Sequence, residues 1–285
     1  MLWAAQALPK DVNLLFVSML YNQDDHPFLT EFLENAGIEK TYRILSEPAQ
    51  IERLFTAPDL FSEAHKCVAD REYAEWASNQ FTPKFDKRRK RKLYITRGKL
   101  SPTLGRYLNE DLLETLLEHA GFEIVAPETM SVCDQLKLYA EADTIIASEG
   151  SALHLICMSL RETATLAVIQ RRPKVPGVIE NQVASFCNAD VHYINVIDRV
   201  FWPKQRADNV SLVRLDFDQL RDTLVSLGVL AKTAEWRVPT KEEEHLSLHA
   251  GRSETEQFLS DKERLVFLKQ LRRKRRARRQ MLAAE

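Results

Sequence analysis

Short apolar runs of four to six residues recur along the chain, separated by amphipathic segments. The central part shows this alternation most regularly, with strands predicted at Leu93–Thr96, Phe122–Ala126, Thr144–Ala147, Thr165–Ile169 and Val191–Val196. Between these runs, apolar residues lie three and four positions apart, which is the spacing of one helix face. Strands that alternate with helices through short connections predict a parallel sheet with helices on both faces. The expected fold class is therefore α/β.

The N-terminal part repeats this alternation less regularly. Strands are predicted at Asn13–Met19 and Tyr42–Leu45, with a third at Ile51–Leu54. Helices are predicted around residues 28–36 and at Ala64–Asn79. This order of elements is compatible with half of a doubly wound sheet.

A charged segment, Lys84–Lys92, separates the two parts and marks the best predicted domain boundary. We expect an N-terminal Rossmann-like lobe at residues 1–90, a second lobe at 91–235, and a C-terminal segment at 236–285. Residues 231–252 are polar and are predicted to be irregular.

The composition favours an ordinary soluble protein. The chain has 285 residues, 45% of them hydrophobic, and a formal net charge of −1, so no overall field attracts polyanions. No apolar run reaches the ~18–20 residues that span a bilayer. The N-terminus lacks the basic start and long apolar centre of a signal peptide. The four cysteines are widely spaced and form no CxxC pair, which is typical of reduced thiols in a cytoplasmic protein.

The C-terminal end departs from this average charge. One helix is predicted from Glu254 to about Gln280, and Lys262–Arg279 holds ten Lys or Arg residues and one Glu. Its apolar stripe and basic end, at residues 258–280, predict a helix that lies on an anionic membrane surface. The alternative is a solvated or packed helix with a basic end. Nucleic acid is not favoured, because no aromatic residues are interleaved with the basic runs.

Polar and small residues follow the predicted strands or begin the predicted helices of the central part. The carboxyl ends of parallel strands meet at one edge of the sheet, where ligands bind in such folds. Arginine there can bind a diphosphate through paired hydrogen bonds, and small residues let a phosphate approach the backbone at a helix start. Each feature alone also fits a tight turn, a helix cap or a surface ion pair. The candidate ligand-binding residues are Arg97, Arg106, Asn109, Glu110, Gln135, Gly150, Ser151 and Ala152.

Several catalytic and binding motifs are absent from the sequence. It contains no DxD, HxH or HExxH motif, so no metal site is predicted. It also lacks the P-loop, the GxGxxG dinucleotide motif and the GxSxG nucleophile elbow.

The order of these residues resembles glycosyltransferase family 61. The family pattern runs roughly R…R…NE…GFE-x-V…EQ…A…GxHGAALTN. The matching residues here are Arg97, Arg106, Asn109-Glu110, Gly121-Phe122-Glu123, Asp134-Gln135, Ala142-Asp143 and Gly150-Ser151-Ala152-Leu153. The resemblance covers about residues 93–158, with weaker agreement on either side.

This resemblance implies a GT-B architecture of two Rossmann-like lobes with parallel sheets, beside the C-terminal basic helix. It implies an inverting transfer from a nucleotide-sugar to a glycan or lipid-linked acceptor, in capsular or envelope polysaccharide biosynthesis. No cofactor is expected, and a metal is not usually essential. The second lobe would hold the donor through the candidate binding residues, and the family's usual N-terminal portion looks shortened.

The chain also departs from the family pattern. Glu149 stands in the place of the usual histidine, Ser151 in that of an alanine, and His154-Leu155 in that of Thr-Asn. A carboxylate beside a diphosphate repels it unless it is paired or turned away. The candidates for the general base are Asp25, His26 and Glu149. Asp25 and His26 also fit a solvated turn before a helix.

Two alternatives to an active transferase follow from the same residues. A catalytically inactive relative would serve as a binding or scaffold subunit, which Glu149 and the short first lobe favour. An RNA-binding protein would use the basic runs at 87–92 and 272–279, but the sequence supplies no stacking surface for bases.

Overall fold

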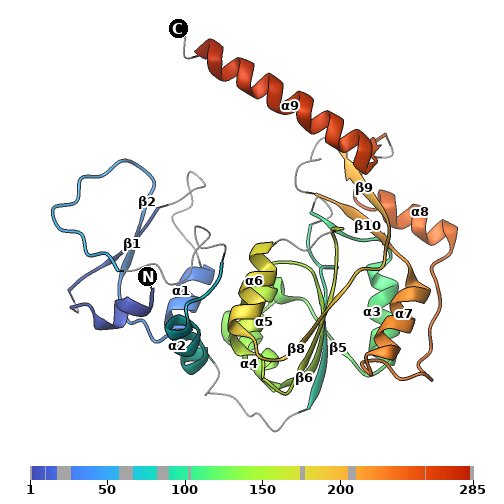
Figure 1. Cartoon of the computed structure of the whole chain (residues 1–285), viewed down its shortest axis with the longest axis horizontal. Helices are drawn as coiled ribbons and strands as arrows, with labels where there is room; N and C mark the ends of the chain where they lie inside the picture. The colour runs from blue at the N-terminus through green and yellow to red at the C-terminus, as the bar shows by residue number, and fades with distance from the viewer. Residues whose placement is uncertain are drawn as a thin grey trace.

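The computed structural model describes residues 2–9, 11–17, 27–57, 67–81, 90–101, 104–173, 177–204, 210–253 and 255–282. A five-stranded sheet forms the centre of the fold (Figure 1). All of its neighbouring strands are parallel, in the order β5-β3-β6-β7-β8. Their bounds are β3 Arg91–Ile95, β5 Glu123–Val125, β6 Ala142–Ser148, β7 Thr165–Ile169 and β8 Asp190–Ile194. The predicted α/β class is confirmed, because this is a mixed α/β fold with parallel strands and a Rossmann-like sheet.

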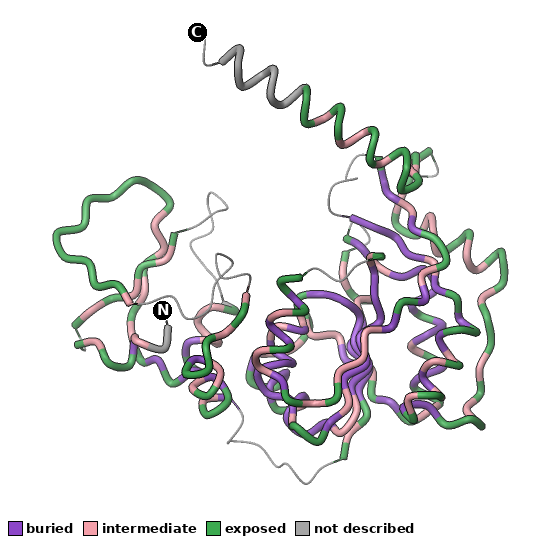
Figure 2. Tube along the Cα trace, viewed as in Figure 1, coloured by how far each residue is buried: buried purple, intermediate pink, exposed green. Residues whose placement is uncertain are grey.

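Helices cover both faces of this sheet, because alternate strand residues point to opposite sides. Leu93, Ile145 and Leu166 pack in a core with α4, α5 and α6, whereas Tyr94 and Ile146 pack in a second core with α3 and α7. Figure 2 shows the sheet buried between these layers. The helix bounds are α3 Glu110–His119, α4 Val132–Glu141, α5 Leu153–Ser159, α6 Gly177–Phe186 and α7 Phe217–Ser226.

The N-terminal part adds a small parallel sheet and two helices. Its two strands, β1 Leu14–Val17 and β2 Tyr42–Leu45, pair in parallel. The remaining elements are the 3₁₀ helix η1 Leu2–Ala7 and the helices α1 Pro27–Asn35 and α2 Arg71–Phe81.

The two N-terminal helices pack directly on the central lobe. Helix α1 contacts α4, and α2 contacts α5 and α6. Leu33 of α1 and Phe81 of α2 belong to the same hydrophobic cluster as one face of the large sheet. The division into domains at residue 90 stays a prediction, and residues 82–89 of the linker lie outside the described part of the chain.

The predicted third N-terminal strand is wrong. Residues 51–54 form no strand; their side chains are exposed, and no neighbouring segment offers them a backbone ladder. The helix predicted at 64–79 begins at Arg71, because the described residues 67–70 are not helical, so its predicted start is wrong.

A second, four-stranded sheet was not predicted from the sequence. Its order is β11-β9-β10-β4, with β10 parallel to β4 and antiparallel to β9. The bounds are β4 Arg106–Tyr107, β9 Ile197–Pro203, β10 Leu212–Leu215 and β11 Phe258–Leu259. This sheet shares a hydrophobic cluster with α3 and α7 and with one face of the large sheet.

The region predicted to be irregular contains helix α8, Lys241–His249, so that expectation is wrong. A capping box begins this helix, because the Thr240 side chain accepts from Glu243 N while the Glu243 side chain accepts from Thr240 N. The local cap stabilises a helix that has little apolar periodicity.

The C-terminal basic helix is α9, Asp261–Leu282. It begins after β11 rather than at residue 254, and Figure 1 shows it extending away from the rest of the fold. Its first turns are fixed to β9, because Trp202 Nε1 donates to Asp261 at 2.6 Å and the Arg264 guanidinium lies 3.7 Å from the centre of the Trp202 ring. None of the helices in the described residues combines the length and apolar character that crossing a membrane requires.

Candidate active site

A cleft of about 790 Å³ lies between α1 and the carboxyl ends of β3 and β6. Phe28 and Phe32 line it from the α1 side. The sheet side supplies most of its polar groups, from Thr96-Arg97 after β3 and from Ser148 and the Gly150–Ala152 segment after β6. The edge of the parallel sheet is therefore where the structure brings the strongest sequence candidates together, as the strand-end rule predicts.

Arg97 is held against the backbone of Gly150. Its Nε donates to Gly105 O at 2.9 Å, and its main-chain N donates to Glu110 Oε1 at 2.8 Å. A Cβ on Gly150 would lie only 2.6 Å from Arg97 Nη1. Glycine at this position thus makes room for the guanidinium group, which gives Gly150 a physical role beyond that of a generic turn residue.

Arg171 is a second arginine at this edge, and it was not predicted. It follows β7, its side chain is buried, and its Nη1 donates to Ser211 Oγ at 3.1 Å. Burial and then the positive charges of Arg97 and Arg172 lower the pKa of Arg171 to about 10. Two guanidinium groups close enough to repel each other form a site that an anion would stabilise.

Glu110 joins the ends of β3 and β6 from the start of α3. Its Oε1 lies within hydrogen-bond distance of four donor groups: Tyr94 Oη, Thr96 Oγ1, Arg97 N and Ser148 Oγ. Burial raises the pKa of Glu110, although hydrogen bonds from Arg97, Thr96 and Tyr94 oppose that shift. Its other oxygen, Oε2, is buried and has no hydrogen-bond partner among the described residues. Glu110 therefore organises the strand ends that carry Arg97.

The glycosyltransferase 61 family model matches residues 8–166, more than half of the chain. The chain belongs to glycosyltransferase family 61. This confirms that it is a glycosyltransferase. The matched segment includes Arg97, Glu110 and Gly150 and ends before Arg171. No curated protein matches the chain.

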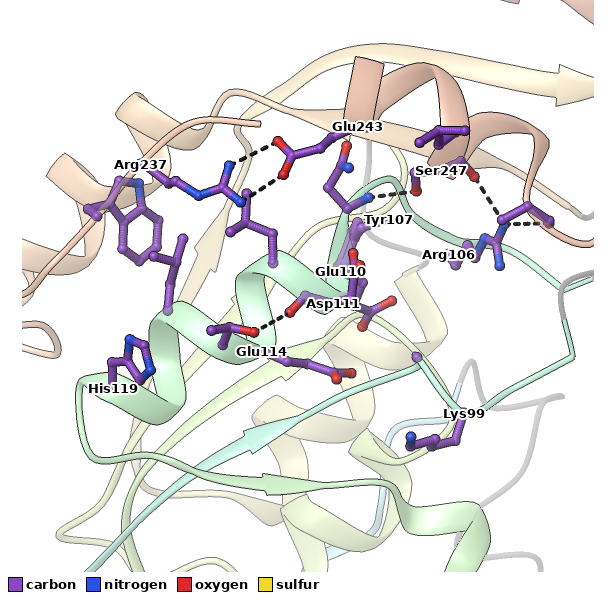
Figure 3. A pocket seen from close by; sticks show the side chains of 18 of the residues that line it. Lys99, Arg106, Tyr107, Glu110, Asp111, Glu114, His119, Arg237, Glu243 and Ser247 are labelled. Carbon is purple, nitrogen blue, oxygen red and sulfur yellow. Dashed lines mark hydrogen bonds and ion pairs between the residues drawn. The ribbon is translucent and has the colours of Figure 1, made fainter. Parts of the chain in front are cut away.

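Three of the family 61 motif residues, Arg106, Asn109 and Glu110, line a different cleft, of about 680 Å³, between α3 and α8 (Figure 3). The Arg106 Nη2 donates to Ser247 O at 3.1 Å and to Ala250 O at 2.9 Å. Asn109 is the N-cap residue of α3 and has a positive φ of 56°, but its side chain makes no capping hydrogen bond. Arg106 belongs to β4 of the small sheet, which separates it from the Arg97 cleft.

Gln135 lines the Arg97 cleft, but its side chain forms hydrogen bonds within the protein. Its Nε2 donates to Pro127 O at 2.9 Å and to Met130 O at 3.2 Å, and its Oε1 accepts from Tyr139 at 3.4 Å. These bonds order the short 3₁₀ segment η2, Pro127–Thr129, at the cleft wall.

Glu149, which replaces the usual family 61 histidine, is fully buried and turned away from the cleft. Its Oε2 accepts from Arg171 N at 3.0 Å, and its Oε1 accepts from Arg172 Nε at 2.6 Å. A carboxylate held in this way repels no diphosphate in the cleft and reaches no acceptor. Its position therefore argues against the expected role as base and for a structural role in holding the two arginines.

Asp25 and His26, the other base candidates, lie outside the described residues. Within the described ranges, no group of three or more His, Cys, Asp or Glu side chains is placed to hold a metal ion.

Proposed function

We propose that this family 61 member transfers a sugar, with inversion, from a nucleotide-sugar to a glycan or lipid-linked acceptor in the Arg97 cleft. The observation that carries the proposal is the contact of Arg97 with Gly150, beside the like-charged Arg171. In-line displacement at the anomeric carbon leaves negative charge on the departing diphosphate, which fixed guanidinium groups stabilise. Because α5 has only seven residues, the proposal rests on these groups and not on a helix dipole.

Arg97, which lines the cleft, supplies positive charge that a metal ion would otherwise supply at the diphosphate; Arg171 is buried beside it and does not line the cleft. We therefore propose that the reaction needs no cofactor or metal. The setting we propose is capsular or envelope polysaccharide assembly on the cytoplasmic side, which the family resemblance supports.

We expect a nucleotide to stabilise the fold, because a ligand that binds only the native state raises its stability. The measurement is thermal unfolding of the full chain with UDP, GDP or CMP and with their sugars, each with and without EDTA. At a concentration 100 times its Kd, the preferred ligand should add about 2.7 kcal/mol to the free energy of unfolding. EDTA should leave this gain unchanged.

If none of these ligands shifts the unfolding temperature, the inactive scaffold alternative replaces the proposal. The observation that favoured that alternative, a carboxylate at position 149, is accounted for by the pairing of Glu149 with Arg172.

We further propose that α9 attaches the protein to an anionic membrane surface. Leu265 and Val266 are exposed on this helix. Phe267 packs against the core, so the first turns of the helix are fixed to the protein. Full-length protein should float with vesicles that contain phosphatidylserine and should dissociate as salt rises. Replacing Lys269, Arg272 and Arg273 together with glutamine should weaken flotation; equal binding to neutral vesicles would contradict the proposal.

A further inference from the structure

The acceptor hydroxyl must lose a proton during the transfer. Of the expected bases, Glu149 does not line the cleft, and Asp25 and His26 lie outside the described residues. Glu128 is a titratable side chain that lines the cleft. It is exposed, and no described residue forms a hydrogen bond with it. His154 lines the same cleft from α5 and is half-buried. A general base must be positioned as well as basic, and His154 has a buried amide partner that Glu128 lacks among the described residues.

That partner is Gln182 of α6, which is only 2% exposed. His154 Nδ1 is hydrogen-bonded to Gln182 Oε1, and Gln182 Nε2 donates back to His154 O at 3.4 Å. The carbonyl oxygen of His154 can only accept, so the Gln182 amide must present its NH₂ there and its oxygen to the ring. Because Gln182 Oε1 can only accept, Nδ1 carries the hydrogen and Nε2 keeps its lone pair.

The described residues offer no hydrogen-bond partner to Nε2. The ring lies one turn beyond Gly150, since Leu153 N donates to Gly150 O at 3.2 Å and His154 N donates to Ser151 O at 3.0 Å. The imidazole and the Arg97 guanidinium therefore line one cleft.

We propose that His154 is the general base of the transfer and that Gln182 is its positioning residue; this rests on the proposed function. Nε2 takes the proton of the acceptor hydroxyl while the acceptor oxygen forms a bond to the anomeric carbon. The bond from that carbon to the diphosphate oxygen breaks, and its electron pair leaves with the nucleoside diphosphate beside Arg97. The protonated imidazole then returns its proton to solvent.

The test uses the nucleotide-sugar that gives the largest thermal shift among the UDP and GDP sugars, with release of the nucleoside diphosphate as the assay. Water serves as the acceptor where the natural one is unknown. His154→Asn should lower kcat by at least about 100-fold and remove the acidic limb of its pH profile. The Kd of the nucleotide should stay within about threefold, because the imidazole acts on the acceptor and not on the diphosphate.

His192→Asn is the matched control. His192 lies on β8, pairs with Asp190 at 2.8 Å and does not line the cleft. This variant should keep the wild-type kcat and pH profile.

Gln182→Glu is the second variant, and it keeps the inference testable if His154→Asn fails to fold. A carboxylate beside Nδ1 favours the charged imidazole, so the acidic limb should move upward by about one pH unit or more. The other titratable groups that line the cleft are Arg97, Glu128 and Cys67, and all are unchanged in this variant.

An unchanged acidic limb in both variants would overturn the role of His154. Wild-type protein that binds none of the nucleotides would instead overturn the proposed function, so the two failures are distinguishable.

Discussion

Replacing Arg97 with alanine is expected to lower turnover by about 10²- to 10³-fold, the usual cost of removing one group that stabilises developing negative charge. Arg97 presents its guanidinium beside Gly150, where the leaving diphosphate is proposed to lie. Arg97→Lys should recover only part of the activity, because an ammonium group lacks the paired donors of the planar fork. Steady-state release of the nucleotide from its sugar measures both variants.

The fold should tolerate the loss of Arg97. The side chain gives up one hydrogen bond, to Gly105 O at 2.9 Å, which is worth about 1 kcal/mol. Its removal also relieves repulsion of the buried Arg171, since the charge of Arg97 helps to lower the pKa of that residue. The free energy of unfolding should therefore change by less than about 1.5 kcal/mol.

Arg71→Ala is the matched control for this substitution. Arg71 lies on α2 with its side chain 90% exposed, and among the described residues it pairs only with Glu75 of the same helix, at 2.7 Å. Neither turnover nor stability should change measurably. Turnover of Arg97→Ala within threefold of wild type would remove Arg97 from the donor site.

Replacing Glu110 with alanine is expected to destabilise the fold by about 3 kcal/mol, because its Oε1 serves four donor groups in a buried place. Glu110→Gln should cost much less. An amide keeps an accepting oxygen, and its NH₂ takes the place of Oε2, which has no partner among the described residues. Urea unfolding measures both variants.

The difference in stability between wild type and Glu110→Gln is expected to change with pH in a defined direction. Burial raises the pKa of Glu110 in the folded state, so the folded chain binds the proton more tightly than the unfolded chain does. The contribution of Glu110 to stability is therefore complete below its unfolded pKa and is lost as the pH rises through the folded pKa. The stability of wild type relative to Glu110→Gln should therefore fall as the pH rises above the unfolded pKa of Glu110.

Glu243→Gln is the control for this pH effect, because its shift has the opposite sign. A hydrogen bond from Arg237 and a backbone hydrogen bond from Thr240 lower the pKa of Glu243 to about 2. Its contribution is present above the unfolded pKa and is lost only as the pH falls toward the folded value. Wild type and Glu243→Gln should therefore differ by a constant amount across the neutral range, whereas a constant difference for Glu110→Gln would contradict the burial argument.

The parallel sheet could be predicted because its strands are buried on both faces and read as continuous apolar runs. The bounds of β2 and β7 agree with the sequence pattern to the residue. Ser131, a residue type that favours the N-cap position, is the N-cap of α4, and its side chain accepts from Asp134 N.

The small sheet could not be predicted from local pattern, whereas the Thr240–Glu243 capping box is a local signal for the start of α8. Strand β4 has only two residues, and β9 mixes buried Val200 and Trp202 with exposed Asp198 and Arg199. These segments become strands because they pair with β10 and β11, which are distant in the sequence. The residues of β4 and β9 themselves give no signal for that pairing.

The residues of the candidate site likewise divide into those that the sequence pattern predicts and those that only the fold brings together. Arg97 and Gly150 were found because each directly follows a buried strand. Arg171 follows β7 in the same way, so applying the strand-end rule to every strand would have found it. Arg106 was misplaced because β4 was not recognised. The pairing of His154 with Gln182 joins two helices across 28 residues, and only the fold brings the two side chains together.

The most direct test of the Arg97 cleft as the donor site is a calorimetric titration of the preferred nucleoside diphosphate into three proteins: wild type, Gly150→Ala and Gly177→Ala. A Cβ on Gly150 would lie 2.6 Å from Arg97 Nη1, whereas a Cβ on Gly177 meets no described atom within 4 Å. Gly150→Ala should displace the guanidinium and weaken binding by about tenfold or more, a loss of at least 1.4 kcal/mol, while its unfolding temperature stays near that of wild type. Gly177→Ala should bind as wild type does. Equal affinity in all three proteins would show that the diphosphate does not lie against Arg97 and Gly150.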